Sequence, residues 1–430
     1  MTGASRREVL GGVGFAAAAP AAGVAKTDAT IADRAWLQVV LERYAGFGIK
    51  ASGGPGDIAC GAWLEDELRG YGYACHRQGF DAPYFEATRS ALSTGSVQAD
   101  VVPQAIVIPT GPQGLAAPLK STCCGGDLTG AIAVIDLPTK RWTGLADPQA
   151  AQPMADAFKR GAAAAILVTN GPSREAIALN ITTHKPGPGK PVAILAPKDA
   201  GPFLAAAAAG QPGALVVDGK GGTRPAFNLV ARLDRGAAKT LILSTPRSGW
   251  FTCAAERGSG LAVWLHLARW LARSHLGVNV ELLATSGHEY EYLGGEHYLT
   301  EAPKPAQTKL WMHIGASAAA RDWHELGARL APLPSADSQR VLTATGDVVE
   351  RVRRAFHGVS GLEAAYVVDR TTAGGELVNV LEAGYGTMIG LYGGHRYFHT
   401  RGDDLRCVSA DLVHPVATAF QTALADCLAG

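Results

Sequence analysis

Apolar positions alternate between helix-like and strand-like spacing along most of the chain. Residues 32–69 carry apolar side chains three and four apart, broken by the Gly53-Gly54-Pro55 turn, which predicts two helices. From residue 228 onward, strand-like runs alternate with helical patterns: strands are expected near 228–235, 239–245, 278–285, 309–317, 364–370 and 385–393, and helices near 260–276, 347–362 and 409–430. This alternation predicts an α/β fold with a mostly parallel mixed sheet sandwiched by helices.

The middle of the chain has a different texture. Residues 96–219 hold short apolar runs punctuated by Gly and Pro, with one helical pattern at 153–164. The sequence therefore predicts an inserted smaller domain at 96–219, which divides the main domain into 26–95 and 220–430. The runs at 130–135, 155–164 and 166–170 resemble the strand–helix–strand core of the protease-associated domain.

The N-terminus carries a targeting pattern. Arg6 and Arg7 precede an uncharged Gly/Ala-rich stretch that ends in small residues near Ala25. This pattern resembles a twin-arginine export signal, so we assign residues 1–25 to the signal and expect a periplasmic or secreted protein. The stretch is too short for a membrane span.

Charge and cysteine content narrow the class of protein. The 430 residues have a formal net charge of only +1, which gives no electrostatic reason to expect a nucleic acid or an anionic membrane as partner. The seven cysteines lack CxxC zinc spacing. A bridge between Cys60 and Cys75 is left open, as is the oligomeric state.

Polar side chains follow several of the predicted strands where they end. In a mostly parallel sheet these ends meet along one edge, where such folds place their sites. The convergence of separate segments at one edge is the main sequence evidence for a site. The candidates are Thr245 and Arg247, Glu256, His288 and Glu289, His313, and Tyr397 and His399.

The order of these segments resembles that of the zinc exopeptidases of the aminopeptidase, carboxypeptidase Q and glutaminyl cyclase type. The matching stretches are residues 245–247, 256–260, 287–295, 312–315 and 399–403, which stand where that family has HxD, DNxSG, GEExGLxGS, a strand ending in Asp, and HTxxD. The resemblance covers nearly the whole mature chain. It implies a metal-dependent hydrolase that acts on an amide of a small peptide-like substrate.

The departures from the family pattern fall on the metal ligands. Carried over by position, one zinc would have Thr245, Glu256 and His313, and the other Glu256, Glu289 and His399. Because Thr is a poor zinc ligand, we expect one zinc ion, held by Glu256, Glu289 and His399 with His313 as an optional fourth ligand. Asp403 is then the expected support for His399, and Arg247 the source of the missing positive charge.

His288 stands where the family has its general-base Glu. A neutral imidazole can take a proton near pH 7, so His288 is the expected base, with a role as metal ligand or substrate donor left open. We expect Glu376, Thr245 and Tyr397 to support the site or contact the substrate. Two other readings remain open: a cyclase, lyase or other enzyme on a small metabolite, and an inactive binding protein.

Overall fold

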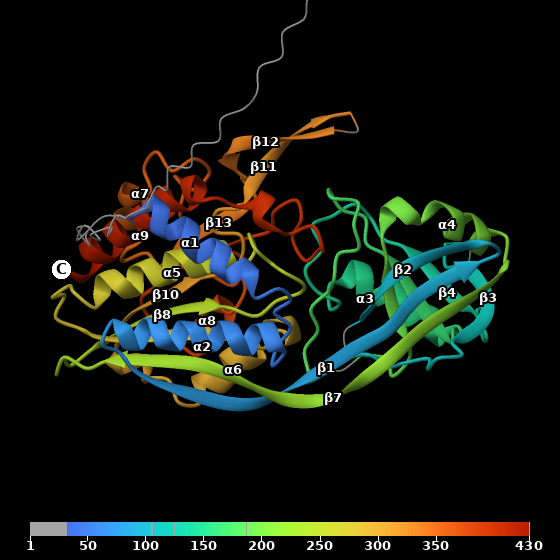
Figure 1. The fold of residues 1–430 in the computed structure, drawn as a ribbon, viewed down its shortest axis with the longest axis horizontal. Coiled ribbons are helices and arrows are strands. Elements are labelled where there is room, and N and C mark those ends of the chain that lie inside the picture. Colours follow the sequence, from blue (N-terminus) through green and yellow to red (C-terminus); the bar gives the residue numbers. More distant parts are fainter. Residues whose placement is uncertain (1–31, 105, 124, 186, 328, 430) are drawn as a thin grey trace, which may run out of the picture.

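The computed structural model describes residues 32–429, except 105, 124, 186 and 328. Figure 1 shows two lobes joined by two long strands, β1 and β7. The helices are α1 (Arg34–Gly46), α2 (Pro55–Gly70), α3 (Pro148–Lys159), α4 (Gly201–Ala208), α5 (Gly258–Leu271), α6 (Leu293–Leu299), α7 (Val349–Ala355), α8 (Leu377–Glu382) and α9 (Ala410–Leu428).

The strands alternate with these helices through most of the chain. They are β1 (Ala74–Thr94), β2 (Val97–Gln104), β3 (Leu115–Ser121), β4 (Ile132–Asp136), β5 (Ala164–Val168), β6 (Val192–Leu195), β7 (Pro212–Leu233), β8 (Thr240–Pro246), β9 (Asn279–Thr285), β10 (Thr308–Ile314), β11 (Arg321–Leu326), β12 (Arg329–Ala336), β13 (Arg340–Ala344), β14 (Tyr366–Val367) and β15 (Met388–Gly393).

The larger lobe is built on a mixed sheet in the order β1-β7-β9-β8-β10-β15-β13-β14. Its central strands β9, β8, β10 and β15 are parallel, whereas β7 and β13 run antiparallel to their inner neighbours. The predicted α/β class with a mostly parallel mixed sheet between helices is confirmed. All four parallel strands end at one edge, and the segments that follow them form the site.

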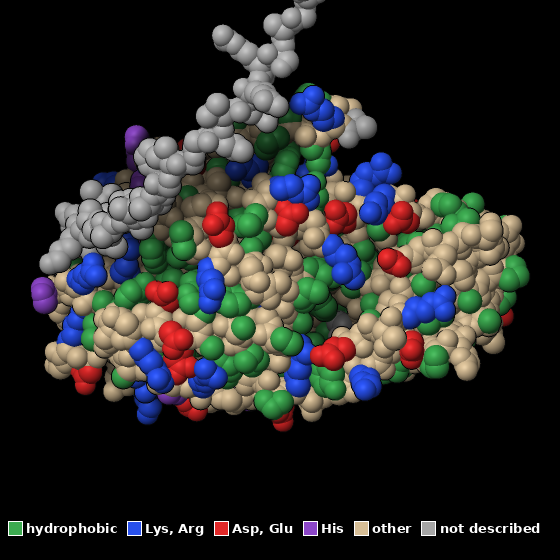
Figure 2. Space-filling view, viewed as in Figure 1, with side chains coloured by type: hydrophobic (Ala, Val, Ile, Leu, Met, Phe, Trp, Pro, Cys, Tyr) green, Lys and Arg blue, Asp and Glu red, His purple; other side chains and the backbone are tan. Residues whose placement is uncertain are grey.

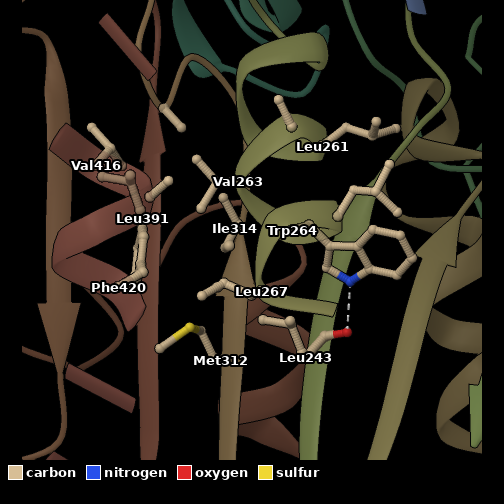
Figure 3. Close-up of a cluster of buried hydrophobic side chains, with 14 of the residues drawn as sticks. Leu243, Leu261, Val263, Trp264, Leu267, Met312, Ile314, Leu391, Val416 and Phe420 are labelled. Carbon is tan, nitrogen blue, oxygen red and sulfur yellow. Dashed lines mark hydrogen bonds between the residues drawn. The ribbon is translucent and has the colours of Figure 1, made fainter. Parts of the chain in front are cut away.

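Helices cover both faces of this sheet. Helices α1, α2, α5 and α9 share one apolar core with the strands, while α6 and α8 cover the other face together with Trp311 and Tyr385. Figure 3 shows the first core, where side chains of α5 and α9 meet those of β8, β10 and β15. Trp264 is fully buried there, and its indole N–H donates to the carbonyl oxygen of Leu243 at 2.9 Å, which satisfies its one polar atom.

Local sequence explains where the first helices begin. Asp33 caps α1 by accepting hydrogen bonds from the backbone N–H groups of Ala35 and Trp36. Pro55 is the first residue of α2, where its missing N–H costs nothing, and Asp147 caps α3 in the same way as Asp33 caps α1.

The smaller lobe consists of a closed ring of strands. Pairing runs β1-β2-β6-β5-β4-β3-β7, and β7 pairs again with β1 along most of its length. Two apolar clusters fill this lobe, one around Trp142 and one around Phe203. The domain boundaries at 96 and 219 stay a prediction, because β1 and β7 run unbroken through both lobes.

Three features were not predicted from the sequence. Strand β1 spans residues 74 to 94, and β7 extends from the strand expected near 228–235 back to Pro212. The hairpin β11–β12 projects from the larger lobe at the top of Figure 1. Cys60 and Cys75, whose pairing the sequence left open, are free cysteines.

Charged side chains of both signs are mixed on the described surface. Figure 2 shows Lys, Arg, Asp and Glu side chains interspersed over the face in view, without a large area of one sign. Among the described residues, no helix is long and apolar enough to cross a membrane. The predicted export signal lies outside the described residues.

Candidate active site

Backbone strain gathers around the edge where the parallel strands end. Non-glycine residues with a left-handed φ are uncommon, and they concentrate at functional sites because the surrounding structure must hold them there. Among the described residues, most of those in this protein lie in the loops at this edge: Phe251, Cys253, Glu291, Tyr292, Ser317 and His399.

Glu256, Arg257 and His399 form the buried centre of the site. Arg257 Nη2 lies 2.7 Å from Glu256 Oε1, and His399 Nε2 lies 3.2 Å from the same oxygen. All three side chains are at most 1 % exposed. Burial alone would raise the pKa of the Glu256 carboxyl, but Arg257 and His399 lower it to about 2, so the carboxylate stays ionised.

His399 is oriented by the smaller lobe. Its Nδ1 lies 2.9 Å from the carbonyl oxygen of Ala178, which can only accept, so Nδ1 carries a hydrogen. The ring also stacks on Phe398 at 3.8 Å between centroids. Its Nε2 faces Glu256 Oε1 at 3.2 Å, so the ring links the smaller lobe to the buried carboxylate.

His288 and Glu376 form a second pair next to this centre. His288 Nδ1 lies 3.4 Å from Glu376 Oε1, and the same oxygen accepts a 2.6 Å hydrogen bond from Thr285 Oγ1. Burial lowers the pKa of His288 well below its usual value, and the charge of Arg257 lowers it further. His288 is therefore neutral at pH 7 and able to accept a proton.

His288 and Tyr292 line a cavity of about 610 Å³. The larger lobe contributes most of the wall, including Phe398 and Tyr392, and the smaller lobe contributes Arg141 and Asn180. Because Nδ1 of His288 faces Glu376, Nε2 is left for a molecule in the cavity. This volume lies in the range typical of pockets for small molecules.

Glu289, a predicted zinc ligand, has other partners. Its Oε2 accepts hydrogen bonds from Ser52 Oγ and Ser248 Oγ, both at 2.8 Å, and its Oε1 accepts one from the backbone N–H of Ser52 at 3.0 Å. The left-handed residues Glu291 and Tyr292 turn the chain sharply just after it. The carboxylate thus ties this loop to the loop before α2.

His313 lies near the end of β10, next to Gly315, which lines the cavity. Its Nδ1 is 3.0 Å from Ser244 Oγ, and burial lowers its pKa to about 4. Its Nε2 is buried without a hydrogen-bond partner among the described residues, and an added Cβ at Gly315 would lie 3.3 Å from it. His313 is thus neutral and close to the site, but it does not contact Glu256.

The other predicted site residues hold the framework. Arg247 lies 3.0 Å from Asp57 and donates to two backbone carbonyls, and Thr245 donates to the carbonyl of Ile314 at 2.7 Å. Tyr397 packs edge-on against Trp323. The positive charge expected of Arg247 is found next to Glu256 on Arg257 instead.

Asp403 supports Glu256 rather than His399. Its two oxygens accept the backbone N–H groups of Ala255 and Glu256 at 2.8 and 2.9 Å. His395, Asp403 and Cys407 also bring ligand-type atoms within 4.8 Å of one another, the one such group among the described residues. Burial raises the pKa of the Cys407 thiol, and its Sγ donates to the carbonyl of Gly402.

Neither the predicted ligand set nor the group of His395, Asp403 and Cys407 has the arrangement that a zinc ion requires. Zinc takes about four ligands in a tetrahedron, and cysteine binds it as thiolate. Of the predicted set, the structure brings together Glu256 and His399, while Glu289 is held by two serines. Asp403 has both oxygens engaged by backbone, and the Cys407 thiol is protonated. The predicted zinc ion and its four ligands stay a prediction.

Two contributors to the site escaped the sequence reasoning. Arg257 directly follows Glu256, and the sequence does not say that both side chains turn inward. Ser52 reaches the site from a loop 237 residues away from Glu289 in the chain, so no local motif joins the two. The one sequence feature that could have pointed to Arg257 is its position in the ERGSG stretch, where the zinc exopeptidases have an asparagine.

A glycine holds the His288 loop against helix α6. An added Cβ on Gly294 would lie 2.0 Å from the carbonyl oxygen of Ser286 and 2.5 Å from Asn228 Oδ1. We therefore expect Gly294→Ala to lower the midpoint of thermal unfolding markedly. Gly46→Ala, where an added Cβ meets nothing within 4 Å, is the matched control and should leave it nearly unchanged. Equal midpoints for the two variants would contradict this packing.

Bacterial peptidases of solved structure, two of them aminopeptidases, share this fold. A zinc aminopeptidase from Bacillus subtilis is 17% identical, with a TM-score of 0.68 over 91% of this chain and 94% of that one. A peptidase M28 precursor from Shewanella amazonensis (17%, TM-score 0.67, 93% and 98%) and an aminopeptidase from Aneurinibacillus (16%, 0.65, 92% and 94%) are similar. No protein-family model and no curated protein matches the chain. The protein thus has the aminopeptidase-type α/β fold expected of the zinc exopeptidases.

Proposed function

We propose that this protein is an enzyme that hydrolyses an amide bond in a small, peptide-like substrate. The observation that carries this proposal is the His288–Glu376 pair, in which His288 lines a 610 Å³ cavity at the ends of the parallel strands. The likeness to aminopeptidase structures supports the fold on which such a site is built, and the chemistry is argued from the side chains.

Water supplies the nucleophile in this reaction. His288 Nε2 takes a proton from water as the water oxygen attacks the carbonyl carbon, and the carbonyl π electrons move onto its oxygen. When the C–N bond breaks, protonated His288 gives that proton to the leaving nitrogen. The products are a carboxylic acid and an amine, and His288 returns to its neutral form.

Glu376 positions the base in this scheme. A carboxylate accepts hydrogen bonds, so its oxygen favours the tautomer with hydrogen on His288 Nδ1 and the lone pair on Nε2. It also stabilises the imidazolium that forms during the reaction. Burial raises the pKa of Glu376, while His313 and the hydrogen bond from Thr285 act in the opposite direction.

The pH dependence of turnover tests the role of His288. The reaction needs the neutral imidazole, whose pKa lies below 6.5. Activity should therefore be constant from about pH 6.5 to 8 and fall as the pH drops through the His288 pKa. Hydrolysis of aminoacyl and dipeptidyl chromogenic amides, measured as kcat/KM against pH, checks this. An activity that rises as the pH falls below 6 would contradict a histidine base.

A zinc-dependent form of this hydrolase is the second candidate. It is favoured by the 3.2 Å contact of Glu256 with His399, whose Nε2 has no hydrogen-bond partner among the described residues. Elemental analysis of the purified mature protein, with Glu289→Ala as the comparison, tests it. About one zinc per chain, lost in the variant, would support the predicted site.

Export through the twin-arginine route is also a proposal. Its support is the Arg6-Arg7 pattern and the small residues near Ala25. Cell fractionation with N-terminal sequencing of the exported form tests it. A protein that keeps its first 25 residues in the cytoplasm would overturn this part of the proposal without affecting the chemistry.

A further inference from the structure

We propose that the Arg257 guanidinium is the built-in cation of this centre, standing where the sequence predicts zinc, so that the protein folds and works without a bound metal ion. Only the statement that the protein is active without a metal ion rests on the proposed function. The statement that Arg257 is the cation of this centre concerns the charges of the folded protein and can be tested without any substrate.

The position of Arg257 disfavours a divalent ion on the Glu256 oxygen that it contacts. Zinc binds carboxylate oxygen at about 2.0–2.2 Å. Arg257 Nη2 already lies 2.7 Å from Glu256 Oε1, so a divalent ion on that oxygen would lie next to a fixed guanidinium charge. Arg257 cannot swing away freely, because its Nε donates to the carbonyl of Ser248 at 3.0 Å.

The charges around the site also need this cation. Glu256 is fully buried, and an unpaired buried carboxylate is strongly destabilising. The other buried cations nearby are engaged elsewhere: Arg247 faces Asp57, and Lys50 donates to the carbonyls of Tyr44 and Gly48. Arg257 is therefore the permanent positive charge that balances Glu256.

Two substitutions separate the arginine from a metal site. In Arg257→Asn the cation is lost and a carboxylate and an imidazole are exposed to ligation, so zinc should now bind and raise the midpoint of thermal unfolding. In Arg257→Lys a positive charge remains, and zinc should have no effect. The double variant Arg257→Asn/Glu256→Gln removes both charges and should fold without gaining zinc affinity, because a neutral amide is a poor zinc ligand.

The test measures zinc content and unfolding midpoint for the full mature chain, after chelation and again after adding zinc. We expect wild-type protein with far less than one zinc per chain and the same midpoint with and without zinc. About one tightly held zinc in the wild type, or an Arg257→Asn protein that zinc does not stabilise, would overturn the inference. A metal-free wild type that cleaves no amide would leave it standing and remove the proposed hydrolysis alone.

Discussion

Replacing His288 with alanine should lower kcat/KM for amide hydrolysis by roughly 10²- to 10⁴-fold, the usual contribution of a general base. The imidazole is the neutral proton acceptor that lines the cavity, and Glu376 fixes its tautomer. Because water must lose a proton as it attacks, the variant loses the chemical step rather than substrate binding. KM should therefore change much less than kcat.

The controls for this variant come from the same chain. His288→Gln keeps a polar side chain of similar size but cannot take up a proton, so it should be as inactive as the alanine variant. His324→Ala removes an exposed imidazole from the projecting strand β11 and should keep full activity. A His288→Gln protein with more than a tenth of wild-type activity would rule out His288 as the base.

The order of elements was predictable because periodicity is local. The hydrophobic pattern of a buried strand such as β9 or an amphipathic helix such as α5 can be recognised within about ten residues of sequence. The extent of β1 and β7 was not predictable, because their pairing partner lies more than a hundred residues away. Gly219 and Gly222 in the middle of β7 read as a loop in the sequence, yet each pairs with β1.

The site was predictable in location but not in its contacts. His288, Glu256 and His399 come from three different segments, and the fold brings them to one edge as the resemblance implied. Which group faces which depends on side-chain direction. Packing between distant segments determines that Arg257 contacts Glu256 and that Ser248 donates a hydrogen bond to Glu289.

These two contacts change what the family resemblance implies for this chain. A carboxylate with zinc as its partner and a carboxylate with arginine as its partner occupy similar places in a motif. They differ in chemistry, because zinc offers open positions for water and substrate, whereas guanidinium offers only hydrogen bonds and charge. The nature of the cation beside Glu256 therefore decides between the two candidate functions.

The second large effect concerns the buried ion pair that holds the site's framework. Asp57 Oδ1 lies 3.0 Å from Arg247 Nε, and its Oδ2 accepts hydrogen bonds from the backbone N–H of Gly53 and from Ser286 Oγ. One carboxylate thus joins the start of α2, the Ser52 loop and the loop that carries His288. Neither Asp57 nor Arg247 is exposed to solvent.

Asp57→Ala should lower the free energy of unfolding by about 3–5 kcal/mol, because it leaves the Arg247 charge buried without a partner. Chemical denaturation measures this. Glu350→Ala removes a carboxylate from an exposed pair with Arg353 and should cost well under 1 kcal/mol. The double variant Asp57→Asn/Arg247→Met removes both charges and should be more stable than Asp57→Ala. If it is less stable, the hydrogen bonds of Arg247 to the carbonyls of Ala284 and Phe227, rather than the balance of charge, hold this part of the fold together.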